Sequence, residues 1–452
     1  MLIFLFLTLI IFTLLVLVVN NGDFLDPLCL SCEVFTFSTF IALLNQKTWQ
    51  LEFFSAKTYF TIILALVFFG IGEIIIKIFF SKKLFVAHKE KRIMLLSQTP
   101  INLSKKLTLG ISLMMLVGAL QILKKTYEIS LQVGNTDGVM GMLASARVAY
   151  IYTDLSLGTD LAIFSFLINA MGYIFTFILV YNTVHFGKRS FSIITVFPIV
   201  VFFFTAALGT GRTVFIRYIV VIITMSVLFV YQKKNIQKTS VPYLCKLIIL
   251  VFLALIIFFT FFQILGIFTG KTGNLTAWDT FSIYTGSSIS AFNNFITNYR
   301  PVSHFWGNES FYGIYGILNK FSSYFPNESI HLDFVYFTSI YKTNVYTSLR
   351  SYIYDFGFIG MCVIQLLIGM AFSFCYMQIR KKRNNFLSIL IYGYFNYGLV
   401  MQGIEDTLFR SFMSITQIFE LFFIIIIYIF LIKPKIFIKN DSNLVLSNEV
   451  KV

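Results

Sequence analysis

Charged side chains are scarce in this chain: 12% of its residues are Asp, Glu, Lys or Arg, and 58% are hydrophobic. Soluble domains carry about 25% charged residues, so the composition argues against a soluble fold of this size. The mean hydropathy of +0.82 points the same way. We therefore expect an all-α polytopic membrane protein.

Cysteine and histidine are also few. The five cysteines all lie in or beside apolar runs: Cys29, Cys32, Cys245, Cys362 and Cys375. They form no disulfide framework, and the C-x-x-C spacing of the first two lacks the second pair or the flanking histidine that a zinc site needs. His304 and His331 are too scattered for a metal site. We predict no metal and no other cofactor.

The excess of basic residues, a net charge of +15, is gathered in short connections between apolar runs. This is the positive-inside pattern, and it places five clusters in the cytoplasm. A basic stripe along one face is missing, so we expect no nucleic-acid partner. The clusters are Lys82 to Lys106, Lys188 with Arg189, Lys233 to Lys246, Arg380 to Arg383, and Lys433 to Lys439.

The apolar runs predict about 11 (10–12) transmembrane helices, each near the roughly 20 residues that cross a bilayer. The second is the weakest; if it only dips into the interface, ten remain and the amino terminus moves inside. The first could also be a signal peptide, but it lacks a charged n-region and a small-residue cleavage site, so we expect a retained helix. The spans are 2–19, 28–44, 58–80, 107–123, 161–181, 191–208, 213–231, 246–266, 352–378, 386–403 and 412–432.

This threading divides the chain into three parts: helices 1–8 in residues 1–266, an extracytoplasmic loop domain in 267–351, and helices 9–11 with a cytoplasmic tail in 352–452. A structureless loop of that length is uncommon, so we expect the loop domain to fold into short helices. A smaller outer segment covers 124–160. The many aromatic residues of the loop domain suit either the apolar face of a sugar or the lipid headgroup belt.

One candidate site is the outer turn Leu208-Gly209-Thr210-Gly211-Arg212-Thr213, with Arg217 farther into the next span. Two glycines permit a tight turn, and a helix start with a guanidinium favours an anion such as phosphate. Arg212 and Arg217 lie on different helix faces. The alternatives are that the Arg212 side chain extends to the lipid headgroups and that Arg217 pairs with an acid on another helix.

A second candidate is the segment Asn344 to Gly357, where the loop domain enters the ninth span. Thr347 or Ser348 can cap that helix, Arg350 lies on its first turn, and Asp355 is buried farther in, where its proton affinity could rise toward that of a base. The alternative is a carboxylate that complements the helix dipole or neutralises Arg350. Glu405, Asp406 and Arg410 gather on the last outer turn, as a binding site or as a surface ion cluster.

At these residues the chain resembles the bacterial oligosaccharide repeat-unit polymerases, the Wzy-type O-antigen and capsule polymerases. The resemblance rests on the Gly-Thr-Gly-Arg-Thr turn, on Tyr284-Thr285-Gly286 leading to Ala291-Phe292-Asn293, and on the passage from Asn344-Val345-Tyr346-Thr347 to Asp355-Phe356-Gly357. It implies a multi-pass glycosyltransferase of the bacterial plasma membrane. On the outer face, such an enzyme transfers the growing glycan from undecaprenyl diphosphate onto a new lipid-linked unit.

The resemblance implies membrane lipid and the lipid-linked oligosaccharide as partners, with the chain-length regulator and flippase of the same pathway as further candidates. We expect Arg212 and Arg350 to stabilise the diphosphate and Asp355 to act as the base. The rival functions are a lipid-linked oligosaccharide flippase and a ligase that uses a different acceptor. The substrate-binding candidates are Thr210, Arg217, Tyr284, Asn293, His304, Asn344, Tyr346, Thr347, Glu405, Asp406 and Arg410.

Overall fold

The packing of the helices divides the chain into two units in the computed structural model, which describes residues 1–51, 53–87, 99–153, 155–187, 190, 192–234, 276–299, 305–326, 332–338, 341–381 and 386–433. Among these residues, unit 1 holds 1–87 and 276–417, and unit 2 holds 99–234 and 418–433. Both units are built almost entirely of helices. The chain is an all-α polytopic membrane protein, with eight helices in the described part long and apolar enough to cross a bilayer.

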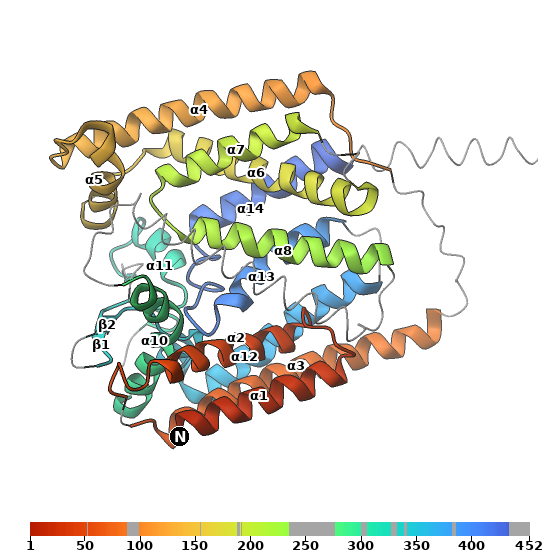
Figure 1. Ribbon diagram of the computed structural model, residues 1–452, viewed down its shortest axis with the longest axis vertical. Coiled ribbons are helices and arrows are strands. Elements are labelled where there is room, and N and C mark those ends of the chain that lie inside the picture. The colour runs from red at the N-terminus through yellow and green to blue at the C-terminus, as the bar shows by residue number, and fades with distance from the viewer. Residues whose placement is uncertain are drawn as a thin grey trace, which may run out of the picture. The chain divides into compact units, whose positions relative to one another are not determined.

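Five long helices form the body of unit 1. The helix α3 packs along α12, α1 packs on α2, and α13 contacts both α2 and α12. In Figure 1 this group runs side by side in the lower half of the picture. The helices are α1 (Leu2–Val19), α2 (Pro27–Leu44), α3 (Ala56–Ala87), α12 (Ser348–Lys381) and α13 (Phe386–Met401).

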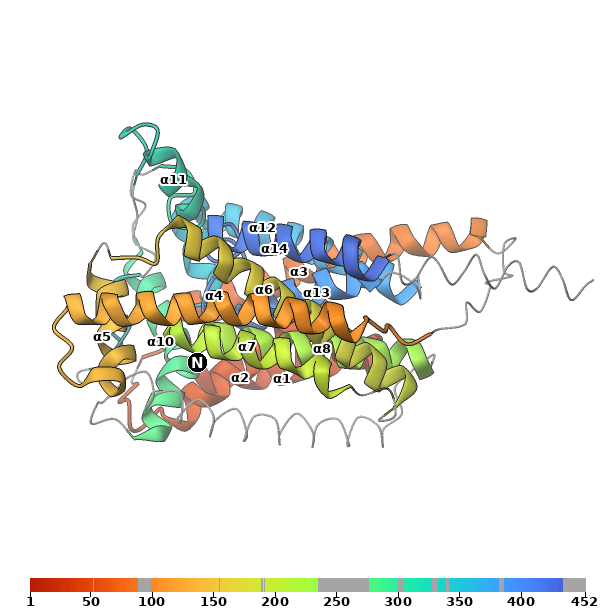
Figure 2. The same ribbon diagram turned by 90° about the horizontal axis from the view of Figure 1, so that it is seen from above.

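The predicted loop domain supplies a further layer at one end of unit 1. The helix α10 (Ala277–Asn298) begins with a capping box between Thr276 and Asp279 and packs against α2 and α3. Beyond it come α11 (Tyr312–Asn319) and an antiparallel pair of short strands, β1 (Val335–Tyr336) and β2 (Lys342–Thr343). Figure 1 shows α10, α11 and the strands at this end of the unit 1 helices, and Figure 2 shows α10 and α11 at the same end. We expected only short helices here, whereas α10 has 22 residues.

Two glycines allow α3 and α12 to approach closely. A Cβ atom on Gly72 would collide with the backbone of Leu366, and one on Gly369 would collide with the backbone of Phe69. Small residues at such crossings let helix backbones come together in a membrane, where packing rather than hydrophobic burial drives association. The long α3–α12 contact therefore depends on these two positions.

Gly357 interrupts α12 near its start. Its φ of 70° and ψ of −177° are not helical, and this region of backbone conformation is open almost only to glycine. The segment Ser348 to Phe356 is thus a short helix of its own, and Asp355 lies at its end. The sequence predicted one continuous span over 352–378, so the break is a correction to that prediction.

Ionic and hydrogen-bonded contacts connect these helices at the ends that lie opposite to α10 and α11. Lys77 on α3 lies 2.6 Å from Asp26 and 2.5 Å from Glu73, and Tyr376 on α12 donates a hydrogen bond of 2.6 Å to Asp23. These contacts hold the α1–α2 connection against α3 and α12. The end of unit 1 that carries α10 and α11 is therefore built on a firmly connected helix group.

Unit 2 is a separate helical layer in which α4 packs against α5, α6 and α7, and α6 packs against α7 and α8. A π-helical turn, Tyr428–Ile432, ends its last helix. The helices are α4 (Lys105–Gln132), α5 (Gly138–Tyr152), α6 (Thr159–Phe186), α7 (Ile193–Leu208), α8 (Thr213–Lys234) and, from residue 418, α14 (Ile415–Ile427).

The predicted spans agree well with these helices. Each of the ten spans on described residues overlaps a helix, including the weak one at 28–44, which is a complete helix from Pro27 to Leu44. The span predicted at 246–266 lies outside the described residues. The division at residues 266 and 351 concerns sides of the membrane rather than packing, and it stays a prediction.

Candidate functional site

The carboxylate of Asp355 anchors the turn that precedes α11. Its Oδ1 accepts a hydrogen bond of 3.0 Å from the backbone N–H of Glu309, and its Oδ2 accepts one of 2.7 Å from that of Ser310. The side chain is buried, with 7% of the residue exposed. Because both oxygens hold backbone amides, Asp355 fixes the position of Glu309 at the end of the short helix in α12.

Glu309 connects two arginines that come from different helices and loops. Its carboxylate forms an ion pair with Arg350, which lies on the first turn of α12 as predicted, and its carbonyl oxygen accepts a 3.0 Å hydrogen bond from Arg410. Burial raises the pKa of Glu309, while the Arg350 guanidinium opposes this shift. Burial thus favours the protonated form of Glu309, and the pairing with Arg350 favours the ionised form.

Aromatic rings contact both guanidinium groups. The central carbon of Arg350 lies 4.6 Å from the ring of Tyr346, 5.3 Å from that of Phe295 and 5.5 Å from that of Tyr354. Arg410 lies 5.0 Å from the ring of Tyr312. Ring faces attract cations, so these contacts orient the arginines without neutralising them.

Asp406, between α13 and α14, is the carboxylate best suited to exchange a proton near neutral pH. Burial raises its pKa to about 7, against the opposing effects of the Phe409 amide and the Arg410 guanidinium. Its Oδ1 accepts hydrogen bonds of 3.1 Å from the Tyr352 hydroxyl and 3.1 Å from the Phe409 N–H. Its Oδ2 is buried and has no hydrogen-bond partner among the described residues.

These groups form one ionic cluster, defined here as Glu309, Arg350, Asp355, Asp406 and Arg410. Asp355 acts electrostatically on both Glu309 and Asp406, and so does Arg410. The structure therefore brings together four residues predicted from the sequence. The fifth, Glu309, was missed because a single glutamate in an aromatic loop gives no local pattern. It is 41 residues from Arg350 in the sequence, and only the tertiary fold brings the two together.

Most of the other candidates in unit 1 lie beside this cluster or help to build it. Tyr346 donates a 3.3 Å hydrogen bond to the Asp333 carbonyl, and Thr347 is buried just before α12. Asn344 lies between β2 and α12, and the Glu405 N–H closes the end of α13 on the Met401 carbonyl at 2.7 Å. Tyr346 is thus the predicted binding residue with the most direct contact to a cluster arginine.

Two candidates lie on α10. Asn293 accepts hydrogen bonds of 2.9 Å from the Ser55 N–H and the Thr58 hydroxyl, and it donates one of 3.1 Å to the Phe53 carbonyl. Its side chain therefore fastens α10 to the segment before α3. Tyr284 is half-buried two turns earlier on the same helix.

The predicted anion turn belongs to unit 2. Thr210, rather than either glycine, has the left-handed conformation, with φ of 54°, and Gly209 is in the ordinary helical region. Arg212 is half-buried at the start of α8. Arg147 of α5, which the sequence did not single out, donates a 3.5 Å hydrogen bond to the Thr210 carbonyl. The turn therefore carries two arginines.

Arg217 lies deeper in α8 and is paired with an acid on another helix. Its guanidinium is 3.8 Å from Glu420 of α14, and Asn169 of α6 donates a 3.0 Å hydrogen bond to the same carboxylate. Arg217 is 3% exposed. This is the alternative left open by the sequence, and the contact links three helices of unit 2.

Arg212 belongs to unit 2, whereas Arg350 and Asp355 belong to unit 1. Their joint action stays a prediction. His304 lies outside the described residues. Comparisons with protein-family models, with curated proteins and with solved structures found no match to the chain.

Proposed function

We propose that this chain is a glycosyltransferase that polymerises undecaprenyl-diphosphate-linked oligosaccharide repeat units on the outer face of the bacterial plasma membrane. The observation that supports this function best is the ionic cluster at the α10–α11 end of unit 1. It combines two aromatic-framed arginines with a buried carboxyl group whose pKa is near 7.

The arginines suit a diphosphate leaving group. A guanidinium matches phosphate oxygens with two parallel N–H donors, and such charge-assisted hydrogen bonds strengthen as negative charge develops on the departing oxygen. Arg350, which is paired with Glu309, keeps 13% of its side chain exposed, whereas Arg410 is 8% exposed and held by the Glu309 carbonyl. Arg212 stays a predicted further donor.

The acceptor sugar needs a base, and the geometry favours Asp406 over Asp355 for this role. Both oxygens of Asp355 hold backbone amides, whereas Oδ2 of Asp406 has no partner among the described residues. In the proposed step, the acceptor hydroxyl gives its proton to Asp406 and its oxygen bonds to the anomeric carbon of the growing chain. The bond from that carbon to the diphosphate breaks, and its electron pair leaves with the diphosphate.

The function can be tested in the native host by deleting the gene and separating the surface polysaccharide on a gel. We expect the ladder to collapse to a single repeat unit and to return with the unaltered chain. Complementation with Arg350→Ala or Asp406→Asn should leave the single unit, because each removes one chemical role. Lys320→Ala is a matched control, since Lys320 is an exposed cation at the end of α11.

The other outcomes separate the rival functions. Loss of all surface sugar with lipid-linked precursor trapped inside the cell would favour a flippase. A normal ladder that is no longer attached to its final acceptor would favour a ligase. A ladder unaffected by the deletion would contradict the proposal.

A further inference from the structure

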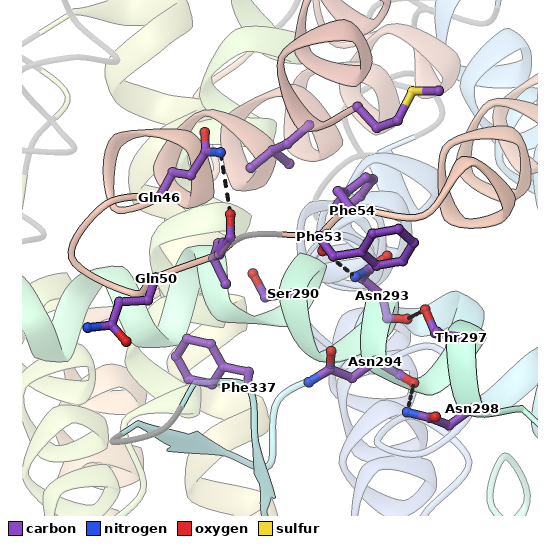
Figure 3. Close-up of a pocket in the computed structure, with 13 residues that line it drawn as sticks. Gln46, Gln50, Phe53, Phe54, Ser290, Asn293, Asn294, Thr297, Asn298 and Phe337 are labelled. Atoms are coloured by element: carbon purple, nitrogen blue, oxygen red, sulfur yellow. Dashed lines mark hydrogen bonds between the residues drawn. The ribbon is translucent and has the colours of Figure 1, made fainter.

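A small cavity lies beside α10, between the start of α1, the segment that follows α2, and Phe337 after β1. Its volume is about 250 Å³. All of its described lining belongs to unit 1. Figure 3 shows Gln46 on one side, Asn294 and Phe337 on the other, and Ser290 between them.

One face of α10 supplies most of the polar lining. Ser290, Asn294 and Asn298 follow one another at intervals of four residues, so they are stacked along the same side of the helix. Serine and asparagine are poor helix formers compared with alanine or leucine. Their regular placement on the wall of a cavity calls for an explanation beyond helix formation.

These amides have hydrogen-bonding capacity to spare. Asn294 donates to the Tyr336 carbonyl at 3.3 Å, Asn298 donates to the Asn294 carbonyl at 3.0 Å, and Gln46 donates to the Leu51 carbonyl at 3.4 Å. Each contact uses one of the two N–H donors of an amide and leaves its oxygen available as an acceptor. Internal hydrogen bonds thus hold these cavity-lining amides in place, and each keeps one donor and one acceptor without a hydrogen-bond partner among the described residues.

The lining also has apolar side chains, which include those of Met1, Leu2 and Leu51. Phe53, Phe54 and Phe337 border the cavity, and none of the described lining residues has a charged side chain. Sugar hydroxyls are donors and acceptors at once, which amides match, and a pyranose ring offers a flat apolar face to an aromatic ring. Apart from the α-amino group of Met1, these residues offer no cationic group to a phosphate or a carboxylate.

We infer that this cavity is a binding site for a single uncharged sugar ring. The volume supports one ring, because it is below the roughly 300–1,000 Å³ of pockets that enclose drug-sized ligands. On the basis of the proposed function, the ring is a neutral sugar of the lipid-linked repeat unit. The cavity then sets a preference for units with an uncharged sugar at this position.

The binding can be measured without any polymerisation. The full chain is purified in lipid nanodiscs, and saturation-transfer NMR compares methyl glucoside, methyl N-acetylglucosaminide and the anionic methyl glucuronoside. We expect saturable binding of a neutral glycoside and at least severalfold weaker binding of the glucuronoside. Asn294→Ala should weaken the neutral sugar roughly threefold to tenfold, the usual effect of one lost hydrogen bond.

Two further variants distinguish a local loss of sugar binding from misfolding of the chain. Asn319→Ala is the matched control, because Asn319 also donates its amide to a backbone carbonyl, that of Phe325, but lies outside the cavity. It should leave sugar binding unchanged. Asn298 is exposed on the cavity rim, so Asn298→Lys should fold normally and should improve binding of the glucuronoside by supplying a cation.

The inference is overturned by stronger binding of the glucuronoside than of both neutral glycosides, by equal losses in Asn294→Ala and Asn319→Ala, or by an absence of saturable sugar binding in nanodiscs. Binding seen only in detergent would also overturn it, since lipid would then be the natural occupant. The polysaccharide ladder is a separate readout. Sugar binding with an unchanged ladder after gene deletion would refute the proposed function and leave the sugar site intact.

Discussion

Asp406 links the local structure to a pH dependence that can be observed. If it is the base, it must be ionised, so the polymerisation rate should rise with pH through about 7 and fall below that value. The Tyr352 hydroxyl donates to Asp406 and stabilises the ionised form. Tyr352→Phe should therefore raise the pKa of Asp406 and move the acidic limb of the rate profile upward by about one pH unit.

The profile is measured in membrane vesicles supplied with lipid-linked repeat units. Tyr315→Phe is a suitable control, because the Tyr315 hydroxyl also makes one hydrogen bond, to the Trp306 carbonyl, but has no contact with Asp406. Identical acidic limbs for the two variants would assign the pH dependence to another group.

The pair of Arg350 and Glu309 gives a second prediction at the scale of the residue. Arg350→Met leaves a buried carboxylate without its cation, and breaking such a pair costs about 3–5 kcal/mol. The side chains keep 13% and 11% exposure, so we expect the lower part of this range. Combining Arg350→Met with Glu309→Gln removes the unpaired charge and should recover most of the lost thermal stability. A double variant as unstable as the single one would contradict this account.

Sequence reasoning found Arg350, Asp355, Asp406 and Arg410 because ionisable residues are rare in so apolar a chain. It could not find Glu309, because the contact of Glu309 with Arg350 depends on how the loop folds back onto α12. The left-handed backbone of Thr210 in the 208–213 turn was not predicted either. The Arg147 contact to that turn is likewise tertiary.

At the scale of the element, the α3–α12 crossing depends on glycine. Gly369→Ala would press a methyl group against the backbone of Phe69, which cannot move as a side chain can, and overpacking of this kind costs about 1–3 kcal/mol. Gly110→Ala on α4 is the matched control, because nothing lies within 4 Å of the added atom. The thermal unfolding of both variants in nanodiscs tests this. Equal melting temperatures would show that the crossing tolerates a wider separation.

The helices themselves were largely predictable, because an apolar run of bilayer length has few other solutions. Their ends were less so: α4 continues to Gln132 and α12 is interrupted at Gly357, neither of which hydropathy reports. The packing of α10 against α2 was not predictable either. It depends on Gly286 of α10, which leaves space for Ile41 and Ala42. Close packing of this kind depends on which helices meet, and a single sequence does not state that.

At the scale of the whole molecule, the basic connections predict that the loop domain at 267–351 is outside the cell and that the Lys82–Lys106 connection is inside. In a variant freed of native cysteines, Asn319→Cys should react in intact cells with a maleimide that does not cross membranes. Lys83→Cys should react only after the cells are opened. The reverse pattern would place the ionic cluster on the cytoplasmic side and contradict the proposed function.

The most direct test of the central claim is reconstitution of the purified chain in liposomes with undecaprenyl-diphosphate-linked repeat units from the native host. We predict longer glycans together with release of undecaprenyl diphosphate, one for each unit added, and loss of both products in Asp406→Asn and Arg350→Ala. Movement of intact lipid-linked units across the bilayer without any lengthening would contradict the account and would identify a transporter.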